Sequence, residues 1–232
     1  MTAKRPAHSV FLILMALTLC AAPLAQEKSV KPGINESWKS SNIEPLINRL
    51  ESESREIYQH RFDLAAITGP RPGTAMADIG AGSGFMALEF AKLIGPQGKV
   101  YAVDINPVMM EQVTKLARQA GIENLETVVN SERSVELAAA SVDLAFICDT
   151  YHHFEYPQDV MATVRQALRP GGQLVVVEFH RVEGESEDWV LEHVRADKDV
   201  FIREIEQSGF RLSNVHQPSF LKDNYILRFV RE

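Results

Sequence analysis

Apolar residues along most of this chain come in short runs that alternate with stretches of helical spacing. Runs rich in valine, isoleucine and leucine predict buried strands near residues 75–79, 100–103, 125–129, 142–148, 174–177, 210–215 and 225–230. Apolar residues recur every three or four positions, which predicts helices, over 85–94, 107–120, 157–168 and 197–207. Strands that alternate with helices are typical of a mostly parallel sheet covered on both faces.

The segments before this alternating region have a different character. Residues 26–42 are polar and contain Pro32 and Gly33, so we interpret them as a linker. Residues 43–73 carry apolar positions at helical spacing and end in Gly69-Pro70-Arg71-Pro72-Gly73. We therefore expect an N-terminal helical lid over 43–73 and a main domain over 74–232.

The first 25 residues follow the order of a secretory signal. Lys4 and Arg5 precede the apolar run 10–19, and small residues continue to Ala25. The run is shorter than the roughly 18 to 20 apolar residues that a membrane-spanning helix needs. We predict that residues 1–25 are a signal peptide and that the protein is exported, to the periplasm or beyond. The alternative is an uncleaved membrane anchor over residues 10–25, which would be the chain's only association with a membrane.

Composition and charge narrow the classes of partner. The 232 residues are 45% hydrophobic, enough for one sizeable core, and carry a formal net charge of −7. An acidic chain without a run of lysine or arginine argues against nucleic acid as a partner. Cys148 is the one cysteine outside the predicted signal, so we expect a buried structural thiol and no internal disulfide. Nothing in the sequence indicates an oligomeric state.

A glycine-rich loop is the strongest chemical signal. It reads Asp78-Ile79-Gly80-Ala81-Gly82-Ser83-Gly84 and lies between a predicted strand and a predicted helix. Glycines there let the backbone approach a ligand closely. A nicotinamide fingerprint would place a glycine where this chain has Phe85, which disfavours a dehydrogenase. Asp104 ends the next strand, where a carboxylate can accept hydrogen bonds from both ribose hydroxyls. The pair predicts a ligand that contains a nucleoside.

Together with four further motifs, the loop resembles the class I S-adenosylmethionine-dependent methyltransferases, in particular the ubiquinone/menaquinone-biosynthesis and type 11 groups. These motifs are Val103-Asp104, Val142-Asp143-Leu144, Asp149-Thr150-Tyr151-His152-His153-Phe154 and Arg169-Pro170-Gly171-Gly172. The resemblance covers about residues 74–177. It implies an α/β fold, a Rossmann-like three-layer sandwich whose seven-stranded, mostly parallel sheet has an antiparallel edge strand. It also implies S-adenosylmethionine as the cofactor and 74–232 as the methyltransferase domain.

The resemblance also implies which residues bind the cofactor. They are Asp78, Gly80, Gly82, Gly84, Asp104, Ile105, Ser131, Glu132 and Asp149. The glycines would border the methionine and ribose, with Asp78 organising the loop and Asp104 taking the ribose hydroxyls. Ile105 would pack on the adenine, and Ser131 or Glu132 would meet its amino group. Asp149 would lie near the methionine end.

The chemistry asked of the protein is modest, because S-adenosylmethionine carries an activated methyl group. The protein mainly has to align an acceptor with that carbon and exclude water. A general base helps only when the acceptor must lose a proton. The candidate catalytic residues are Tyr151, His152 and His153, although the histidines could instead only brace their loop. His152, His153, His180 and Glu178 are of metal-binding type but lack a distinctive ligand spacing, so no metal is predicted.

Side chains from other segments are candidates for the edges of the site. Arg55, Tyr58 or Arg61 of the lid could reach the cofactor's carboxylate, and an exposed salt bridge is the alternative for either arginine. Residues that could line an acceptor pocket are Trp189, His193 and Arg195.

We predict a methyltransferase that acts on an unidentified small molecule. An exported domain would lie where S-adenosylmethionine is not expected to be made. The alternative is therefore an exported protein of the same fold that binds S-adenosylmethionine or another nucleoside without turnover.

Overall fold

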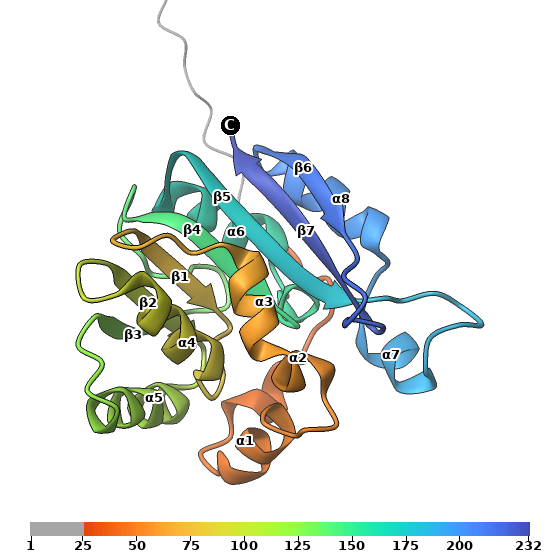
Figure 1. Ribbon diagram of the computed structural model, residues 1–232. Coiled ribbons are helices and arrows are strands. Elements are labelled where there is room, and N and C mark those ends of the chain that lie inside the picture. The colour runs from red at the N-terminus through yellow and green to blue at the C-terminus, as the bar shows by residue number, and fades with distance from the viewer. Residues whose placement is uncertain (1–25) are drawn as a thin grey trace, which may run out of the picture.

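Seven strands form one sheet in the computed structural model, which describes residues 26–232 (Figure 1). The strand order is β3-β2-β1-β4-β5-β7-β6. The strands are β1 (Ala75–Ile79), β2 (Lys99–Asp104), β3 (Leu125–Val129), β4 (Val142–Cys148), β5 (Leu168–Phe179), β6 (Phe210–His216) and β7 (Asn224–Arg231). Pairs among β3, β2, β1, β4 and β5 are parallel, whereas β7 runs antiparallel to both β5 and the edge strand β6. The predicted fold class is confirmed.

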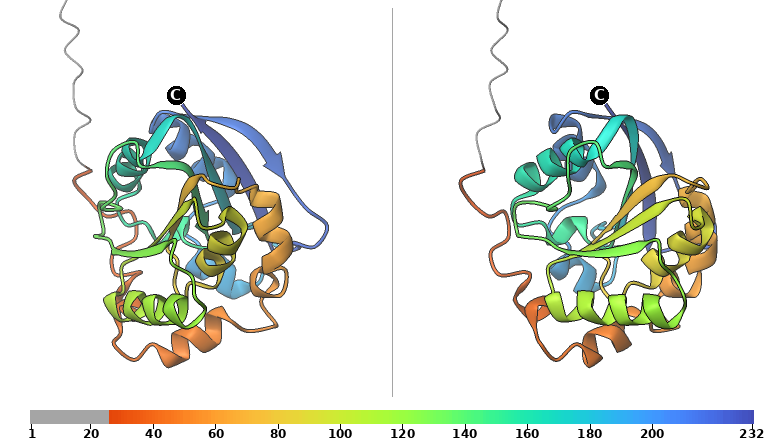
Figure 2. Two further views of the ribbon diagram at one scale, coloured as in Figure 1. Left: turned by 60° about the vertical axis from the view of Figure 1, so that its left-hand side comes forward. Right: turned by 90° about the vertical axis from the view of Figure 1, so that its left-hand side faces the viewer.

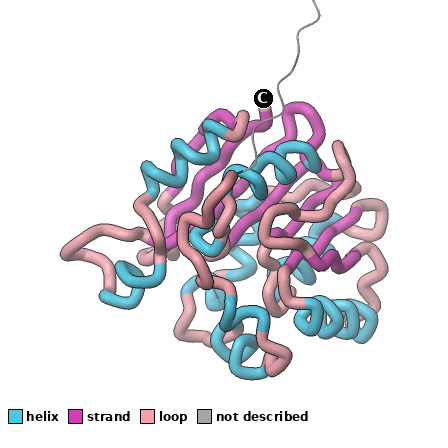
Figure 3. The backbone as a smooth tube through the Cα atoms, turned by 180° about the vertical axis from the view of Figure 1, so that it is seen from behind, coloured by secondary structure: helices cyan, strands magenta, loops and turns pink. Residues whose placement is uncertain are grey.

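Helices cover both faces of this sheet (Figure 2). They are η1 (Glu36–Lys39), α1 (Glu44–Leu50), α2 (Glu56–Gln59), α3 (Arg61–Thr68), α4 (Phe85–Ile94), α5 (Pro107–Gln119), η2 (Tyr151–His153), α6 (Pro157–Ala167), α7 (Asp188–His193) and α8 (Lys198–Gln207). Helices α3, α4 and α5 share one hydrophobic cluster with the sheet, and α6, α7 and α8 share the other. Seen from behind, the strands form a layer among these helices (Figure 3).

Burial on both faces explains why the central strands are almost continuously apolar. Along β5, Leu174 and Val176 face the α6–α8 cluster, while Val175 and Val177 face the α3–α5 cluster. Successive side chains of a strand point to opposite faces, so a strand covered on both sides needs an apolar residue at every position.

Local signals determine where α5 begins and ends. The Asn106 side chain accepts hydrogen bonds from the backbone N–H groups of Val108 and Met109, at 2.9 and 3.2 Å. Pro107 occupies the first turn, where its missing N–H is not needed. Gly121, with φ of 66°, follows the helix. The observed helix agrees with the one predicted over residues 107–120.

Strand β5 begins earlier than the sequence indicated. We expected it to start near Leu174, but Leu168 already pairs with Val142 of β4. The register between the two strands then shifts between Val142 and Leu144. The motif Arg169-Pro170-Gly171-Gly172 is therefore part of an irregular strand.

The segment before α1 lies against the domain. Val30 donates its N–H to the carbonyl of Glu155 at 2.9 Å, and Gly33 donates to the Glu155 carboxylate at 3.0 Å. Asn35 donates its side-chain amide to the carbonyl of His153 at 3.0 Å. The predicted signal peptide lies outside the described residues. Among residues 26–232, no helix is long and apolar enough to cross a membrane.

The aromatic pair between α4 and β4 offers a test of the core. Phe90 and Phe146 are both fully buried, with ring centroids 5.0 Å apart. We expect Phe90→Ala to lower the free energy of unfolding by about 3–5 kcal/mol, because it leaves a cavity. Urea unfolding monitored by circular dichroism measures this change. Leu93 lies on the same helix and is 47% exposed. Leu93→Ala is therefore the control and should lower the free energy of unfolding by less than about 1 kcal/mol.

Candidate active site

Four neighbouring strands each carry an acidic side chain at their carboxyl end. Asp104 is the last residue of β2, and Asp149 directly follows β4. Asp78 and Glu178 each lie one residue before the end of β1 and β5. The strand order β2-β1-β4-β5 places these four acids in one row, which we call the acidic row. Ligands of parallel sheets bind at this edge, so the row marks the candidate site.

Asp104 and Asp78 flank the glycine loop. Asp104 accepts backbone hydrogen bonds from Gly82 and Asn106, each at 2.9 Å. Asp78 is buried, and its Oδ2 has no hydrogen-bond partner among the described residues. Burial, with the nearby charge of Asp104 as a second cause, raises the pKa of Asp78 to about 7.

The other two acids are paired by side chains. Asp149, whose φ of 46° is in the left-handed region, accepts hydrogen bonds from Arg55 Nη2 and Asn224 Nδ2, both at 2.6 Å. Burial raises the pKa of Asp149, and the Arg55 charge opposes that shift. Glu178 is fully buried, and its carboxylate oxygens lie 2.9 Å from Nδ1 of His152. Each of these acids thus has a partner brought by another segment of the chain.

A cavity opens beside the glycine loop and Asp104. Eight of the nine predicted cofactor-binding residues line it: Asp78, Gly80, Gly82, Asp104, Ile105, Ser131, Glu132 and Asp149. We call it the cofactor cavity. The exception, Gly84, precedes α4 with φ of 80°, and a Cβ there would lie 2.6 Å from Val113. Gly84 therefore allows α4 and α5 to pack closely rather than lining the cavity.

The glycines of the loop leave room that no other residue would leave. Gly80 has φ of 75°, and a Cβ on it would lie 2.2 Å from the Thr150 side chain. A Cβ on Gly82 would lie 2.7 Å from Leu50 of α1, so the first lid helix rests directly on the loop. This narrow cradle, together with the acidic row, suits a nucleoside that carries a positive sulfonium.

A second cavity adjoins the first. It is lined mainly by aromatic, histidine and charged side chains, including Trp38, Arg49, Leu50, Arg55, Asp149, His152, His153, Phe179, Trp189 and His193. Five of these residues, Trp38, Leu50, Arg55, Asp149 and His153, also line the cofactor cavity. We call it the acceptor cavity, because it meets the cofactor cavity at the methionine end that we assigned to Asp149.

The structure separates the three candidate catalytic residues. His152 and His153 lie at the acceptor cavity. Tyr151 does not reach it, because its fully buried ring packs against Phe201 of α8 and its hydroxyl donates to Glu204 at 3.1 Å. Burial raises the pKa of Tyr151 well above its usual value. Tyr151 is therefore placed as a core residue rather than as a base.

His153 and His193 are held in their neutral forms. Burial lowers the pKa of His153 to about 2 and that of His193 to about 4, with the neighbouring histidine as the next cause in both. A neutral imidazole with so low a pKa is a weak proton acceptor at pH 7. Cys148 lines the cofactor cavity, and burial raises the pKa of its thiol, so it is no nucleophile there.

Of the other side chains predicted at the edges of the site, some line the cavities and some point away from them. Arg55 lines both cavities and is not an exposed salt bridge, while Arg61 lies over the ring of Tyr58. Trp189 lines the acceptor cavity, but Arg195 points to Glu204 and away from it. Trp38 and Leu50 line both cavities and were not among the predicted site residues. The only signal for Trp38 was a tryptophan inside an otherwise polar segment.

Comparisons with known proteins agree with this site. Residues 77–176 match a family model described as a methyltransferase domain. The ubiquinone/menaquinone biosynthesis C-methyltransferase UbiE of Pseudomonas fluorescens (strain SBW25) is 29% identical over 137 residues, which are 59% of this chain and 53% of that protein. The chain thus spans about half the length of this curated relative.

Solved structures share the fold. A SAM dependent methyltransferase from Aquifex aeolicus has a TM-score of 0.71 and 23% identity, covering 80% of this chain and 97% of its own. The [4+2]-cyclase SpnF also has a TM-score of 0.71, with 14% identity, covering 88% of this chain and 96% of its own.

The fold, the glycine loop with Asp104 and the match over residues 77–176 are all similar to those of class I methyltransferase domains. Domains of this kind use S-adenosylmethionine, the cofactor that the sequence predicted. Within this class, the chain is similar to C-methyltransferases of quinone biosynthesis.

The raised pKa of Asp78 makes stability depend on pH. Folded Asp78 keeps its proton up to about pH 7, whereas the unfolded chain releases it near pH 3.8. The stabilisation from this proton is therefore complete below pH 3.8 and is lost as the pH rises through 7. Between pH 5 and 8, the free energy of unfolding of the wild type should fall by on the order of a few kcal/mol. Asp78→Asn has no carboxyl group at this position and should not show this fall. Urea unfolding of both proteins across this range measures it, and parallel pH profiles would contradict the assignment.

Proposed function

We propose that this protein transfers the methyl group of S-adenosylmethionine to a small molecule in the acceptor cavity. The observation that carries the proposal is the junction of the two cavities, which share Arg55, Asp149 and His153. A methyl donor in one cavity and an acceptor in the other would meet at this junction. Alignment of that kind supplies most of the catalysis that methyl transfer from an activated donor requires.

We propose a flat aromatic acceptor of the phenol or quinol type. Three aromatic side chains, Trp38, Phe179 and Trp189, line the acceptor cavity, and the rings of Phe179 and Trp189 meet edge to face at 5.2 Å. Aromatic walls favour a planar ring by stacking and edge contacts. The name of the relative in Pseudomonas fluorescens, a C-methyltransferase of quinone biosynthesis, supports the same class of acceptor.

Each part of the site has its own task in this reaction. S-adenosylmethionine supplies the activated methyl group when it is bound. Asp104 and the glycine loop hold the nucleoside, and Leu50 of α1 covers the loop and keeps water out. The ion pair between Arg55 Nη2 and Asp149 Oδ2, at 2.6 Å, holds both charged side chains in place where the two cavities meet. Trp189 and its neighbours orient the acceptor ring.

Cofactor binding is the first test. Asp104→Asn keeps the size of the side chain but weakens its hydrogen bonds to ribose, which are charge-assisted in the wild type. We expect the affinity for S-adenosylmethionine to fall about 10- to 100-fold in isothermal titration calorimetry. Asp63→Asn, at a carboxylate that is 65% exposed, is the control and should bind as the wild type does. Equal affinities of the wild type and Asp104→Asn, or binding of NAD instead, would refute the assignment.

Turnover is the second test. We expect release of S-adenosylhomocysteine when the protein is given S-adenosylmethionine and a panel of hydroquinones and phenols. Trp189→Ala should raise the KM for the acceptor more than it lowers kcat, because the side chain lines the acceptor cavity without reaching the cofactor cavity. Binding of the cofactor without release of product from any acceptor would favour the alternative of a binding protein without turnover.

We also propose that residues 1–25 direct export, on the strength of Lys4, Arg5 and the apolar run that follows them. A reporter enzyme that is active only outside the cytoplasm, fused after Ala25, should be active. Leu12→Arg together with Leu14→Arg, which interrupts the apolar run, should abolish that activity. Reporter activity that survives this change would argue against a signal peptide.

A further inference from the structure

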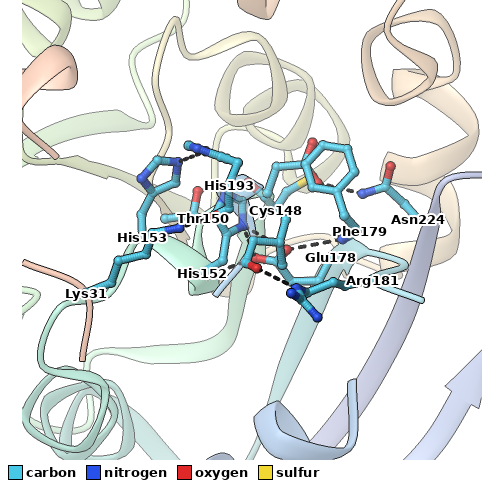
Figure 4. Close-up of polar contacts among 12 residues, drawn as sticks. Lys31, Cys148, Thr150, His152, His153, Glu178, Phe179, Arg181, His193 and Asn224 are labelled. Carbon is cyan, nitrogen blue, oxygen red and sulfur yellow. Dashed lines mark hydrogen bonds and ion pairs between the residues drawn. The ribbon is translucent and has the colours of Figure 1, made fainter. Parts of the chain in front are cut away.

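Three histidines converge at the acceptor cavity. His152 and His153 come from η2, and His193 is the last residue of α7. One nitrogen from each residue lies within 4.8 Å of the corresponding nitrogens of the other two. Nε2 of His153 and Nε2 of His193 are 3.2 Å apart, and Figure 4 shows the two rings joined at this contact. We call these residues the histidine cluster.

A buried carboxylate orients the first of these imidazoles. Glu178 accepts from Nδ1 of His152, which leaves Nε2 of His152 as its remaining ligand atom. Glu178 also accepts the backbone N–H of His152 and of Phe179, each at 3.1 Å, so the carboxylate is fixed in place (Figure 4). Metal-bound histidines commonly give their other nitrogen to a carboxylate in this way, which fixes the ring and its tautomer.

His153 lacks an oxygen partner for its ring. Its Nδ1 is buried without a hydrogen bond among the described residues, and its Nε2 has only the Nε2 of His193 nearby. Two imidazole nitrogens facing each other can share one proton at most, and buried polar atoms are normally satisfied. One shared proton joins the two facing nitrogens as an N–H···N hydrogen bond, and a cation between the rings could take the place of that proton.

The spacing of the cluster matches the size of a metal centre. Zinc–nitrogen bonds of about 2.0–2.1 Å in a tetrahedron place neighbouring ligand nitrogens about 3.3 Å apart. The 3.2 Å between His153 and His193 agrees with this value, and the 4.8 Å limit for the third nitrogen means that His152 would have to move inward by up to about 1.5 Å. Glu178 and Asp149 place negative charge near the cluster. Lys31 and Arg49 place positive charge near it as well.

We propose that His152, His153 and His193 bind a divalent transition metal, with Zn²⁺ as the reference ion and the fourth coordination position facing the acceptor cavity. Three imidazoles with one open position are a ligand set used by catalytic zinc sites. This site differs from the metal-binding residues considered in the sequence analysis. His180 is outside the cluster, with its Nε2 2.7 Å from Gln217, and His193 takes the third place.

The open position would receive an oxygen of the acceptor, an extension that rests on the proposed function. A metal-bound phenol loses its proton to solvent more readily than a free one, because the cation stabilises the phenolate. The site itself does not depend on this role.

Metal binding by the purified protein tests the site directly. After treatment with a chelator, the protein should take up one Zn²⁺ per chain in calorimetry, and Co²⁺ should produce the visible absorption of a tetrahedral nitrogen-ligated ion. Glu178→Gln should weaken binding about 10- to 100-fold, and His193→Ala should weaken it more, because it removes a ligand. His180→Ala is the matched control and should bind as the wild type does.

The His193→Ala variant also separates folding from metal binding. His193 is only partly buried and does not line the cofactor cavity, so the variant should retain its circular dichroism spectrum and its affinity for S-adenosylmethionine. Absence of stoichiometric metal uptake by the wild type, or full uptake by folded His193→Ala, would overturn the site. Failure of the wild-type protein to bind S-adenosylmethionine would instead refute the proposed function, and the result on metal binding would be unaffected.

A spectroscopic measurement tests whether the fourth coordination position of the metal faces the acceptor cavity. Adding catechol, as a phenolic probe, to the Co²⁺-loaded protein should change the visible spectrum, because the probe's oxygen enters the coordination sphere. Trp189→Ala, which alters the wall of the acceptor cavity, should weaken this response without reducing Co²⁺ uptake. An unchanged spectrum at saturating catechol would show that the fourth position does not open to the acceptor cavity.

Discussion

The burial of negative charge along one edge of the sheet is the constraint on which the rest of the site depends. An unpaired carboxylate removed from water costs several kcal/mol, so each acid of the acidic row needs a partner or a proton. A backbone N–H group donates to Asp104, Arg55 and Asn224 donate to Asp149, and His152 donates to Glu178. Asp78 instead keeps its proton up to about pH 7. These partners come from the lid, from β7 and from η2, so neutralising the row draws distant parts of the chain to one place.

The same requirement ties the lid to the catalytic edge, while its first helix, α1, stays at the surface. Arg55 reaches Asp149 from the turn after α1, and Leu50 rests on Gly82. Yet α1 contains no buried residue, and its apolar side chains pack only partly buried against the α3–α5 cluster. Segments with little buried apolar surface open at low cost, and a cofactor enclosed beneath α1 needs such an opening to enter and leave.

Local motifs in the sequence indicate which residues lie together, whereas contacts between distant segments leave no such signal. The glycine loop, Asp104 and the strand ends each sit in a short motif, and eight of nine assigned cofactor residues line one cavity. Tyr151 shares a motif with His152 and His153, but the 3-10 turn directs its ring toward α8. His193 was expected at an acceptor pocket and lines the acceptor cavity, but it lies forty residues from His153, and no periodic pattern links the two. Only the packing of α7 against the acceptor cavity brings them together.

In the proposed reaction, the acidic row also has to balance two demands of methyl transfer. Negative charge near the cofactor favours a positive sulfonium, but that charge disappears as the methyl group leaves, so stabilising it too strongly would slow the reaction. The proton on Asp78 and the Arg55 charge beside Asp149 both reduce the net negative potential where the sulfonium would lie. Because the same fold also occurs in a protein named as a cyclase, such details of charge, rather than the topology, have to select the reaction.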